Sequence, residues 1–419
     1  MKVLGIITEY NPFHNGHKYH IDEAKKITGA DYVIAVMSGD FVQRGCPAII
    51  SKYDRNLMAL NNGVDLVFEL PVCYSTGSAQ YFALGAVSLL NSLGIVDYIC
   101  FGSEIGDIKD LEEAAGMFFN PTESFQRTLY SYIREGFSYP AARAKAAEES
   151  LSIDGESNNT YIAKVISEPN NILGIEYIKA LKQIDSTIQP VTIKRHMANY
   201  HDEKPGLLLS SATAIRSVLE KKHNSNLPSI KSSVPKNVYD YFTDNNYITY
   251  PITIEDFSAI IKYKLLSESS RELSSYLDLS SDIADRIKNI NIQDLSMDEL
   301  SQSIKTKNIT LTRVNRALIH VLLNIRKEAF QEYIDDGDFI YYLRLLGMKK
   351  EASHLIRKIK NHGKLPVITK VSRAYKQLDS LGMKMLNQDI LATHLYNQVT
   401  HDKFKKTIPN EYKRGIITA

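Results

Sequence analysis

Two histidines near the start of the chain have the spacing of a phosphate-binding helix start. His14 and His17 flank Gly16 within the segment GIITEYNPFHNGHKYH, which runs from Gly5 to His20. Residues three apart lie on one helix face, so both imidazoles can donate hydrogen bonds to one phosphoryl group. A helix N-terminus attracts phosphate through its free N–H groups, and a glycine there lets a ligand approach the backbone. We therefore expect donors that stabilise charge on phosphoryl oxygens in a transition state, although two surface histidines are the plain alternative.

A later segment could complete such a site. Residues Ser210–Arg216 read SSATAIR. The hydroxyls of Ser211 and Thr213 can cap the free N–H groups of a helix or bind phosphate. Arg216, one turn further on, supplies a charged fork for the same oxygens. A simple capping sequence followed by a surface arginine is the alternative interpretation.

Strands and helices must alternate to position these side chains. Apolar runs typical of buried strands occur at Val3–Thr8, Tyr32–Ser38, Leu66–Glu69, Tyr98–Gly102 and Val191–Lys194. Helical segments lie between them, at Lys18–Thr28, Lys52–Asn62, Gln80–Ser92 and Ile172–Gln183. This alternation predicts an α/β fold with a parallel sheet, covered by helices, that binds ligands at the carboxyl ends of its strands.

The character of the chain changes after about Pro235. Glycine becomes rare, and apolar residues between Leu311 and Ile325 recur at helical spacing. We expect a catalytic domain over residues 1–234, with a helical insertion at about 105–160. A mainly helical C-terminal domain should then cover residues 235–419.

Composition narrows the class of protein. Hydrophobic residues make up 44% of the chain, charged residues 23%, and the net charge is only +2. No run approaches the roughly 20 apolar residues of a membrane helix, and the N-terminus lacks the pattern of a signal peptide. We therefore expect a cytoplasmic protein with no membrane partner. The three cysteines form no CxxC pair or Cys/His cluster, so no metal site is predicted.

Polar residues after the second strand could contact a substrate. Asp40, Gln43 and Arg44 lie in the segment SGDFVQRG, at the expected carboxyl end of that strand. Asp54 and Arg55 follow in the next helix, where they could contact substrate or form a structural pair with each other.

A basic stretch in the C-terminal half is a candidate RNA-binding surface. Between Lys349 and Lys376 there are nine lysines and arginines and one acid. Such a stretch can follow a phosphate backbone, although a solvated charged face is the alternative. Four residues on and after the 311–325 helix could extend it: Arg313, Arg316, Arg326 and Lys327.

These motifs together resemble a known family. HxGH and S-x-T-x-I-R segments are similar to signatures of the nucleotidylyltransferase superfamily. The longer segments Met37–Pro71, FGSE at 101–104, PNNILG at 169–174 and SATAIR resemble the bacterial tRNA(Met) cytidine acetate ligase family. The likeness covers most of residues 1–220 and continues more weakly to the end. It implies a nucleotidylyltransferase-like, Rossmann-like parallel sheet.

The resemblance also implies a two-step reaction. Acetate would attack the α-phosphate of ATP and release pyrophosphate, leaving acetyl-adenylate. The N4 amine of the wobble cytidine of elongator tRNA(Met) would then take the acetyl group. Carboxylate attack at phosphorus is an in-line displacement that mostly needs positioning and charge neutralisation, and Mg²⁺ is expected to assist it.

By the same resemblance, His14 and His17 are catalytic and a larger set binds ATP. Without it, Gly102 would be a turn glycine, Asn170 a helix N-cap and Arg195 a solvated charge. The implied ATP-binding residues are Ile7, Thr8, Glu9, Tyr10, Asn11, Pro12, Phe13, His14, Asn15, Gly16, His17, Lys18, Tyr19, His20, Gly102, Asn170, Arg195, Ser211, Thr213 and Arg216.

Two other functions fit parts of the sequence. A small-molecule adenylyltransferase would share the HxGH and S-x-T-x-I-R segments, but it would not need the long basic C-terminal half. A non-catalytic RNA-binding protein with a vestigial site is the second alternative. The intact His14, Gly16, His17 and Arg216 argue against it.

Overall fold

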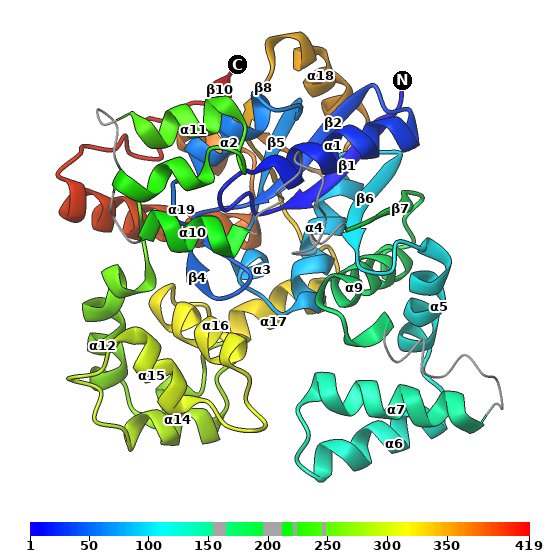
Figure 1. The fold of residues 1–419 in the computed structure, drawn as a ribbon, viewed down its shortest axis with the longest axis vertical. Helices are drawn as coiled ribbons and strands as arrows, with labels where there is room; N and C mark the ends of the chain where they lie inside the picture. The colour runs from blue at the N-terminus through cyan, green and yellow to red at the C-terminus, as the bar shows by residue number, and fades with distance from the viewer. Residues whose placement is uncertain (154–164, 196–211, 221–223, 245–248) are drawn as a thin grey trace.

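A computed structural model describes residues 1–153, 165–195, 212–220, 224–244 and 249–419 (Figure 1). Among these residues, eight strands form one central sheet in the order β10-β8-β5-β2-β1-β6-β7, with β9 paired to β8. Its parallel part consists of β1 (Val3–Thr8), β2 (Tyr32–Ser38), β5 (Leu66–Leu70), β6 (Tyr98–Ser103) and β7 (Gln189–Lys194). The predicted parallel α/β sheet is confirmed, with strand ends within two residues of the expected ones.

Alternate residues of each strand point to opposite faces of the sheet, and each face has its own core. Val3 and Ile34 belong to one core, Leu4 and Val33 to the other. The first core is covered by α4 (Ala79–Ser92) and α9 (Pro169–Gln183). The second is covered by α1 (Asn15–Thr28), α2 (Lys52–Leu60), α10 (Ala212–Glu220) and α11 (Lys236–Thr243).

Two predicted helices begin earlier than expected. Helix α1 begins at Asn15 rather than Lys18, because His14 is its N-cap and closes a capping box with His17. Helix α9 begins at Pro169 rather than Ile172, with Glu168 as its N-cap. Asn170 is therefore inside the first turn, and its alternative interpretation as an N-cap is wrong.

Helical segments flank the sheet at its carboxyl edge (Figure 1). The expected insertion contains α5 (Ile108–Phe119), α6 (Glu123–Arg134) and α7 (Tyr139–Ile153). A second helical group follows α11. It consists of α12 (Ser258–Ser267), α13 (Ser270–Leu273), α14 (Ser281–Lys288), α15 (Met297–Ile304), α16 (Leu311–Leu322) and α17 (Lys327–Asp336). The α6–α7 turn reaches this group, because a Cβ on Gly136 would lie 3.2 Å from Nδ2 of Asn308.

The last part of the chain completes the sheet, which the sequence did not predict. Strand β8 (Leu343–Met348) pairs antiparallel with β5, and β9 (Val367–Ile368) and β10 (Ile417–Thr418) pair with β8. Helices α18 (Ser353–His362) and α19 (Ser380–Phe404) lie beside these strands. A division of the chain at about residue 235 stays a prediction, but it does not separate the sheet from the C-terminal half.

The remaining elements are short. They are α3 (Val72–Ser75), the antiparallel pair β3 (Phe41–Val42) and β4 (Cys46–Pro47), and 3-10 turns at Asn224–Ile230, Ile254–Phe257, Lys350–Ala352 and Val371–Lys376. No helix in the described ranges combines the length and the apolar character that a membrane crossing would require.

Candidate nucleotide-binding site

The loop after β1 is anchored by its own aromatic side chains. Tyr10 and Phe13 are buried, with ring centroids 4.8 Å apart, and the Tyr10 ring lies 4.9 Å from that of His17. The Tyr10 backbone has a φ of 46°, in the left-handed region. Apolar packing by Tyr10 and Phe13 therefore fixes the loop beneath the helix start. Contact of these two residues with ATP stays a prediction.

A buried arginine ties this loop to the neighbouring strand ends. Arg55 donates to the carbonyl oxygens of Glu9 at 2.6 Å, Ser38 at 3.1 Å and Ile50 at 3.2 Å, and to that of Gly39. The alternative that Asp54 and Arg55 pair with each other is wrong, because the Arg55 guanidinium donates to backbone carbonyl oxygens instead. Asp54 accepts from the Ser51 hydroxyl at the start of α2. Substrate contact by either residue stays a prediction.

The two histidines of the motif are held as hydrogen-bond donors. His14 Nδ1 accepts from the Gly16 N–H at 3.0 Å, and His17 Nδ1 accepts from the His14 N–H at 3.2 Å. The rings stack with centroids 3.7 Å apart and planes 20° apart. Because Nδ1 is the acceptor in both rings, we assign the proton to Nε2 in each. Each neutral ring then directs an Nε2–H donor away from the helix backbone.

The surroundings keep both rings uncharged near neutral pH. Burial, then Arg195 and Arg216, lower the pKa of His14 to about 4. Burial, then His14, His20 and Arg195, lower the pKa of His17 well below its usual value. Arg195 and Arg216 are thus cations near the two rings, and the histidines act as neutral donors.

Two of the predicted residues, Gly102 and Arg195, meet at the ends of β6 and β7. Arg195 follows β7 and donates its N–H to Ser103 O at 2.8 Å. A Cβ on Gly102 would lie 3.1 Å from Arg195 Cγ, so the glycine makes room for the arginine across the strand end. Because Arg195 also lowers the pKa of His14, the structure brings these residues to one edge.

Arg216 joins the same edge from α10. Its Nη1 donates to Asn11 O at 2.8 Å and its Nη2 donates to Thr213 Oγ1 at 3.0 Å. Ser211 lies outside the described residues. The S-x-T-x-I-R segment therefore reaches the HxGH loop through its arginine.

Other predicted residues have structural partners. Asn15 donates from N to Ser233 O at 2.9 Å and from Nδ2 to Ser232 O at 2.8 Å. Lys18 pairs with Asp22 at 2.6 Å, and His20 Nε2 lies 3.6 Å from Cys100 Sγ. Contact of these side chains with ATP stays a prediction, as it does for Ile7, Thr8, Pro12 and Tyr19.

The loop after β2 also folds back on the site. The Gln43 N–H donates to Glu9 Oε1 at 2.9 Å, and buried Asp40 accepts the Lys52 N–H at 2.8 Å. Substrate contact by Asp40, Gln43 and Arg44 remains a prediction. Within the described ranges, no group of three or more His, Cys, Asp or Glu side chains could hold a metal ion.

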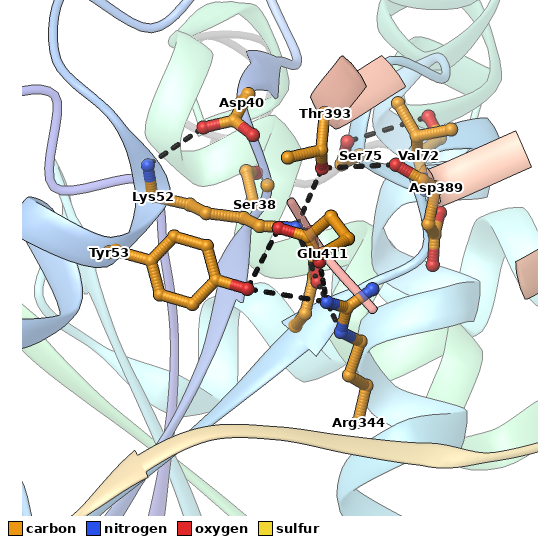
Figure 2. A network of polar contacts seen from close by, with 12 residues as sticks. Ser38, Asp40, Lys52, Tyr53, Val72, Ser75, Arg344, Asp389, Thr393 and Glu411 are labelled. Carbon is orange, nitrogen blue, oxygen red and sulfur yellow. Dashed lines mark hydrogen bonds and ion pairs between the residues drawn. The ribbon is translucent and has the colours of Figure 1, made fainter. Parts of the chain in front are cut away.

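A buried ionic network beside this edge was not predicted (Figure 2). Lys52 Nζ donates to Glu69 at 2.8 Å and lies 3.6 Å from Glu411, while Arg344 bonds both glutamates. Tyr53 donates to Glu411 Oε1 at 2.8 Å. Sequence spacing carries no signal for it, because Lys52 and Glu411 are joined only by the fold.

The first part of the basic stretch, up to Lys364, lies at the opposite edge of the sheet. Met348, the last residue of β8, pairs with Leu66, the first residue of β5. Residues 349–364 therefore lie beside the amino ends of the parallel strands, where Lys358 Nζ contacts Met1 Sδ at 3.3 Å and the Lys364 N–H donates to Ser92 O at 3.0 Å. The chain then returns along β8, because Val367 of β9 pairs with Leu343. Eight of the nine cations are exposed, and Lys349 is half-buried beside Asp65.

The cations that could extend that surface have partners inside the protein, and their contact with RNA stays a prediction. Arg313 and Arg316 donate to Asp278 at 3.2 and 2.7 Å, and Lys327 donates to two backbone carbonyl oxygens. The guanidinium of Arg326 lies over the Tyr276 ring. These contacts hold the helical group together.

Known proteins similar to the chain support this arrangement. The family model described as HIGH Nucleotidyl Transferase matches residues 1–411. A tRNA(Met) cytidine acetate ligase of Acetivibrio thermocellus is 38% identical over 419 residues, covering 100% of both chains. One of Halothermothrix orenii is 39% identical, covering 100% of this chain and 99% of its own. The crystal structure of Thermotoga maritima TmcAL bound with alpha-thio ATP has a TM-score of 0.91 and 30% identity, covering 100% of this chain and 99% of that one.

Proposed function

The chain belongs to the tRNA(Met) cytidine acetate ligase family, and we propose that it is the ATP-dependent ligase that forms N4-acetylcytidine at the wobble position of elongator tRNA(Met). Full-length similarity to these ligases supports the overall reaction. The observation that carries the first step is the pair of neutral, stacked imidazoles with Nε2–H donors at one helix start.

In the first step, an acetate oxygen attacks the α-phosphorus of ATP. The bond to the bridging oxygen breaks on the opposite side, and pyrophosphate leaves with the electron pair. His14 and His17 donate to α-phosphate oxygens, where neutral donors lower the barrier without attracting a second anion. Arg195 and Arg216 supply the charge that offsets the phosphates. No protein nucleophile is needed.

In the second step, the N4 amine of cytidine attacks the carbonyl carbon of acetyl-adenylate. The carbon–oxygen bond to phosphate breaks, AMP leaves, and one proton is lost from N4. The mixed anhydride is a reactive acyl donor, so a weakly nucleophilic amine suffices. The protein's main contribution is to hold the two reactants together in the correct orientation.

We propose that Mg²⁺ binds together with ATP and is not held by the protein alone. Magnesium often binds through one or two carboxylates together with substrate phosphates and water. Glu9 is the carboxylate of the loop that leads into the motif, and one of its oxygens already accepts the Gln43 N–H. This donor set fits an ion held mainly by the phosphates, where it would neutralise charge.

We assign nucleotide chemistry to residues 1–234 and tRNA binding to residues 235–419, in the cytoplasm where tRNA is modified. The basic stretch is the proposed tRNA surface because its cations are exposed and nearly unopposed by acids. A six-residue strand such as β1 spans about 17 Å, so the cations between Lys349 and Lys364 lie about that far from the HxGH loop along the sheet. An RNA that reaches both must extend beyond its anticodon loop.

The test is incubation of the protein with ATP, radiolabelled acetate and bulk tRNA, followed by nucleoside analysis. Labelled N4-acetylcytidine, AMP and pyrophosphate are expected. Acetyl-CoA without acetate and ATP should give no product. Acetylation from acetyl-CoA alone, or release of ADP and phosphate, would overturn the adenylate mechanism.

A further inference from the structure

The carboxylate of Glu104 accepts hydrogen bonds from the first turn of α9. Glu104 directly follows β6, and its Oε1 accepts the Asn170 N–H at 3.2 Å and also a side-chain N–H of Asn170. Its Oε2 accepts the Asn171 N–H at 2.8 Å. A carboxylate is favoured there by the partial positive charge of a helix N-terminus.

Asn171 returns these bonds. Its Oδ1 accepts the N–H groups of Glu104 at 2.9 Å and Ile105 at 3.2 Å, and its side chain is buried. The end of β6 and the start of α9 are therefore joined by hydrogen bonds in both directions. The N-terminus of α9 is occupied by this internal carboxylate, so it is not free to bind the phosphates of ATP.

The hydrogen bond to Glu104 also fixes the orientation of the Asn170 side-chain amide. Because Nδ2 donates to Glu104, Oδ1 and the second N–H remain for another partner. Asn170 is only partly buried. Gly102, against which Arg195 lies, is two residues before Glu104 on the same strand.

We propose that Glu104 is a positioning residue for the nucleoside half of ATP. It holds Asn170 so that Oδ1 accepts a hydrogen bond from an N–H or O–H donor of the nucleoside. This inference rests on the proposed function, because it assumes that the edge formed by Gly102, Asn170 and Arg195 binds ATP. The donor is the adenine amino group or a ribose hydroxyl.

The direct test is Glu104→Gln, which keeps the shape of the side chain but places an amide opposite N–H donors. In acetate-dependent ATP–pyrophosphate exchange, the KM for ATP should rise about tenfold, with kcat changed by less than about threefold. The matched control is Glu168→Gln, at the N-cap two residues before Asn170, where the side chain makes no capping bond. Equal effects of the two variants would overturn the proposal.

A double-mutant cycle separates positioning from general stability. Asn170→Ala should raise the KM for ATP, and adding Glu104→Gln to it should raise KM little further, because Glu104 acts through Asn170. A KM in the double variant that is raised by the product of the two single effects would contradict this. If Glu104→Gln does not fold, Glu104→Asp keeps the charge, shortens the reach and should show the same rise in KM.

Substrate analogues identify the donor. Wild-type protein should prefer ATP to GTP, and Asn170→Ala should reduce that preference, if the adenine amino group is recognised. A reduced preference for ATP over its 2′-deoxy form would instead indicate a ribose hydroxyl. If Asn170→Ala keeps both preferences at the wild-type level, the inference is overturned. If wild-type protein binds ATP in a direct titration but shows no exchange, the proposed function fails, while Glu104 and Asn170 remain testable through the ATP dissociation constant.

Discussion

His17 accepts the backbone N–H of His14 through its Nδ1 atom, so the second histidine of the motif fixes the backbone that carries the first. His17→Ala should therefore remove one transition-state donor and loosen the other. We expect acetyl-adenylate formation to fall by about 10²-fold or more, measured as acetate-dependent ATP–pyrophosphate exchange. His401→Ala, at an exposed histidine on α19, is the control. Near-normal exchange by His17→Ala would remove the role assigned to the motif.

The lowered pKa of His14 predicts the pH dependence of both activity and stability. With a folded pKa of about 4, His14 stays a neutral donor between pH 6 and 9, so exchange should show no inflection near 6.5. Its unfolded pKa is about 6.5, so the unfolded chain binds the proton first as pH falls. The free energy of unfolding should decrease from pH 6.5 toward 4. An inflection near 6.5 that His14→Ala abolishes would contradict the neutral assignment.

Charge reversal at the edge opposite the HxGH loop should separate tRNA binding from adenylation. Changing Arg357, Lys358 and Lys360 to Glu should weaken binding of whole tRNA. The slope of log affinity against log salt should become shallower by about one unit for each phosphate that the variant no longer neutralises. Exchange without tRNA should be unchanged.

An isolated anticodon stem-loop is the internal control for that experiment. Because the reversed residues lie beside the amino ends of the strands, the affinity of the stem-loop should respond much less than that of whole tRNA. An unchanged salt slope for whole tRNA in the folded triple variant would place the RNA surface elsewhere.

The buried network makes Glu411 a stability determinant. Burial alone would raise the pKa of Glu411, but Lys52 and Arg344 lower it to about 2. Its ionised form therefore stabilises the fold above pH 4.5, and this stabilisation is lost as pH falls through about 2. Glu411→Gln should cost about 3 kcal/mol at pH 7 in denaturant unfolding, because two buried cations lose a counter-charge.

The control for that measurement is Glu332→Gln, which removes a pair with Lys384 whose side chains are 44% and 43% exposed. It should cost less than about 1 kcal/mol. Equal losses in the two variants would mean that the network contributes no more than a surface pair.

Local patterns predicted most of the sheet and the centre of the candidate site. Buried strands such as Tyr32–Ser38 read as continuous apolar runs, and the HxGH spacing is a local feature. The partners of Arg55 could not be predicted, because they are four backbone carbonyl oxygens and every residue type has such an oxygen. Strand β8 was missed because it follows a long helical region and joins the sheet antiparallel, where only the fold brings Glu69 and Arg344 together.

The pairing of β8 with β5 bears on how the protein is made. Ribosomal synthesis releases β5 long before residues 343–348, so one edge of β5 has no partner while some 270 residues are still being added. All five residues of β5 are buried in the finished fold, and an apolar edge of this kind is a template for pairing between chains. In a fragment ending near residue 235, which lacks β8, that edge of β5 would stay unpaired. Such a fragment should aggregate, so adenylation is best studied with the full-length chain.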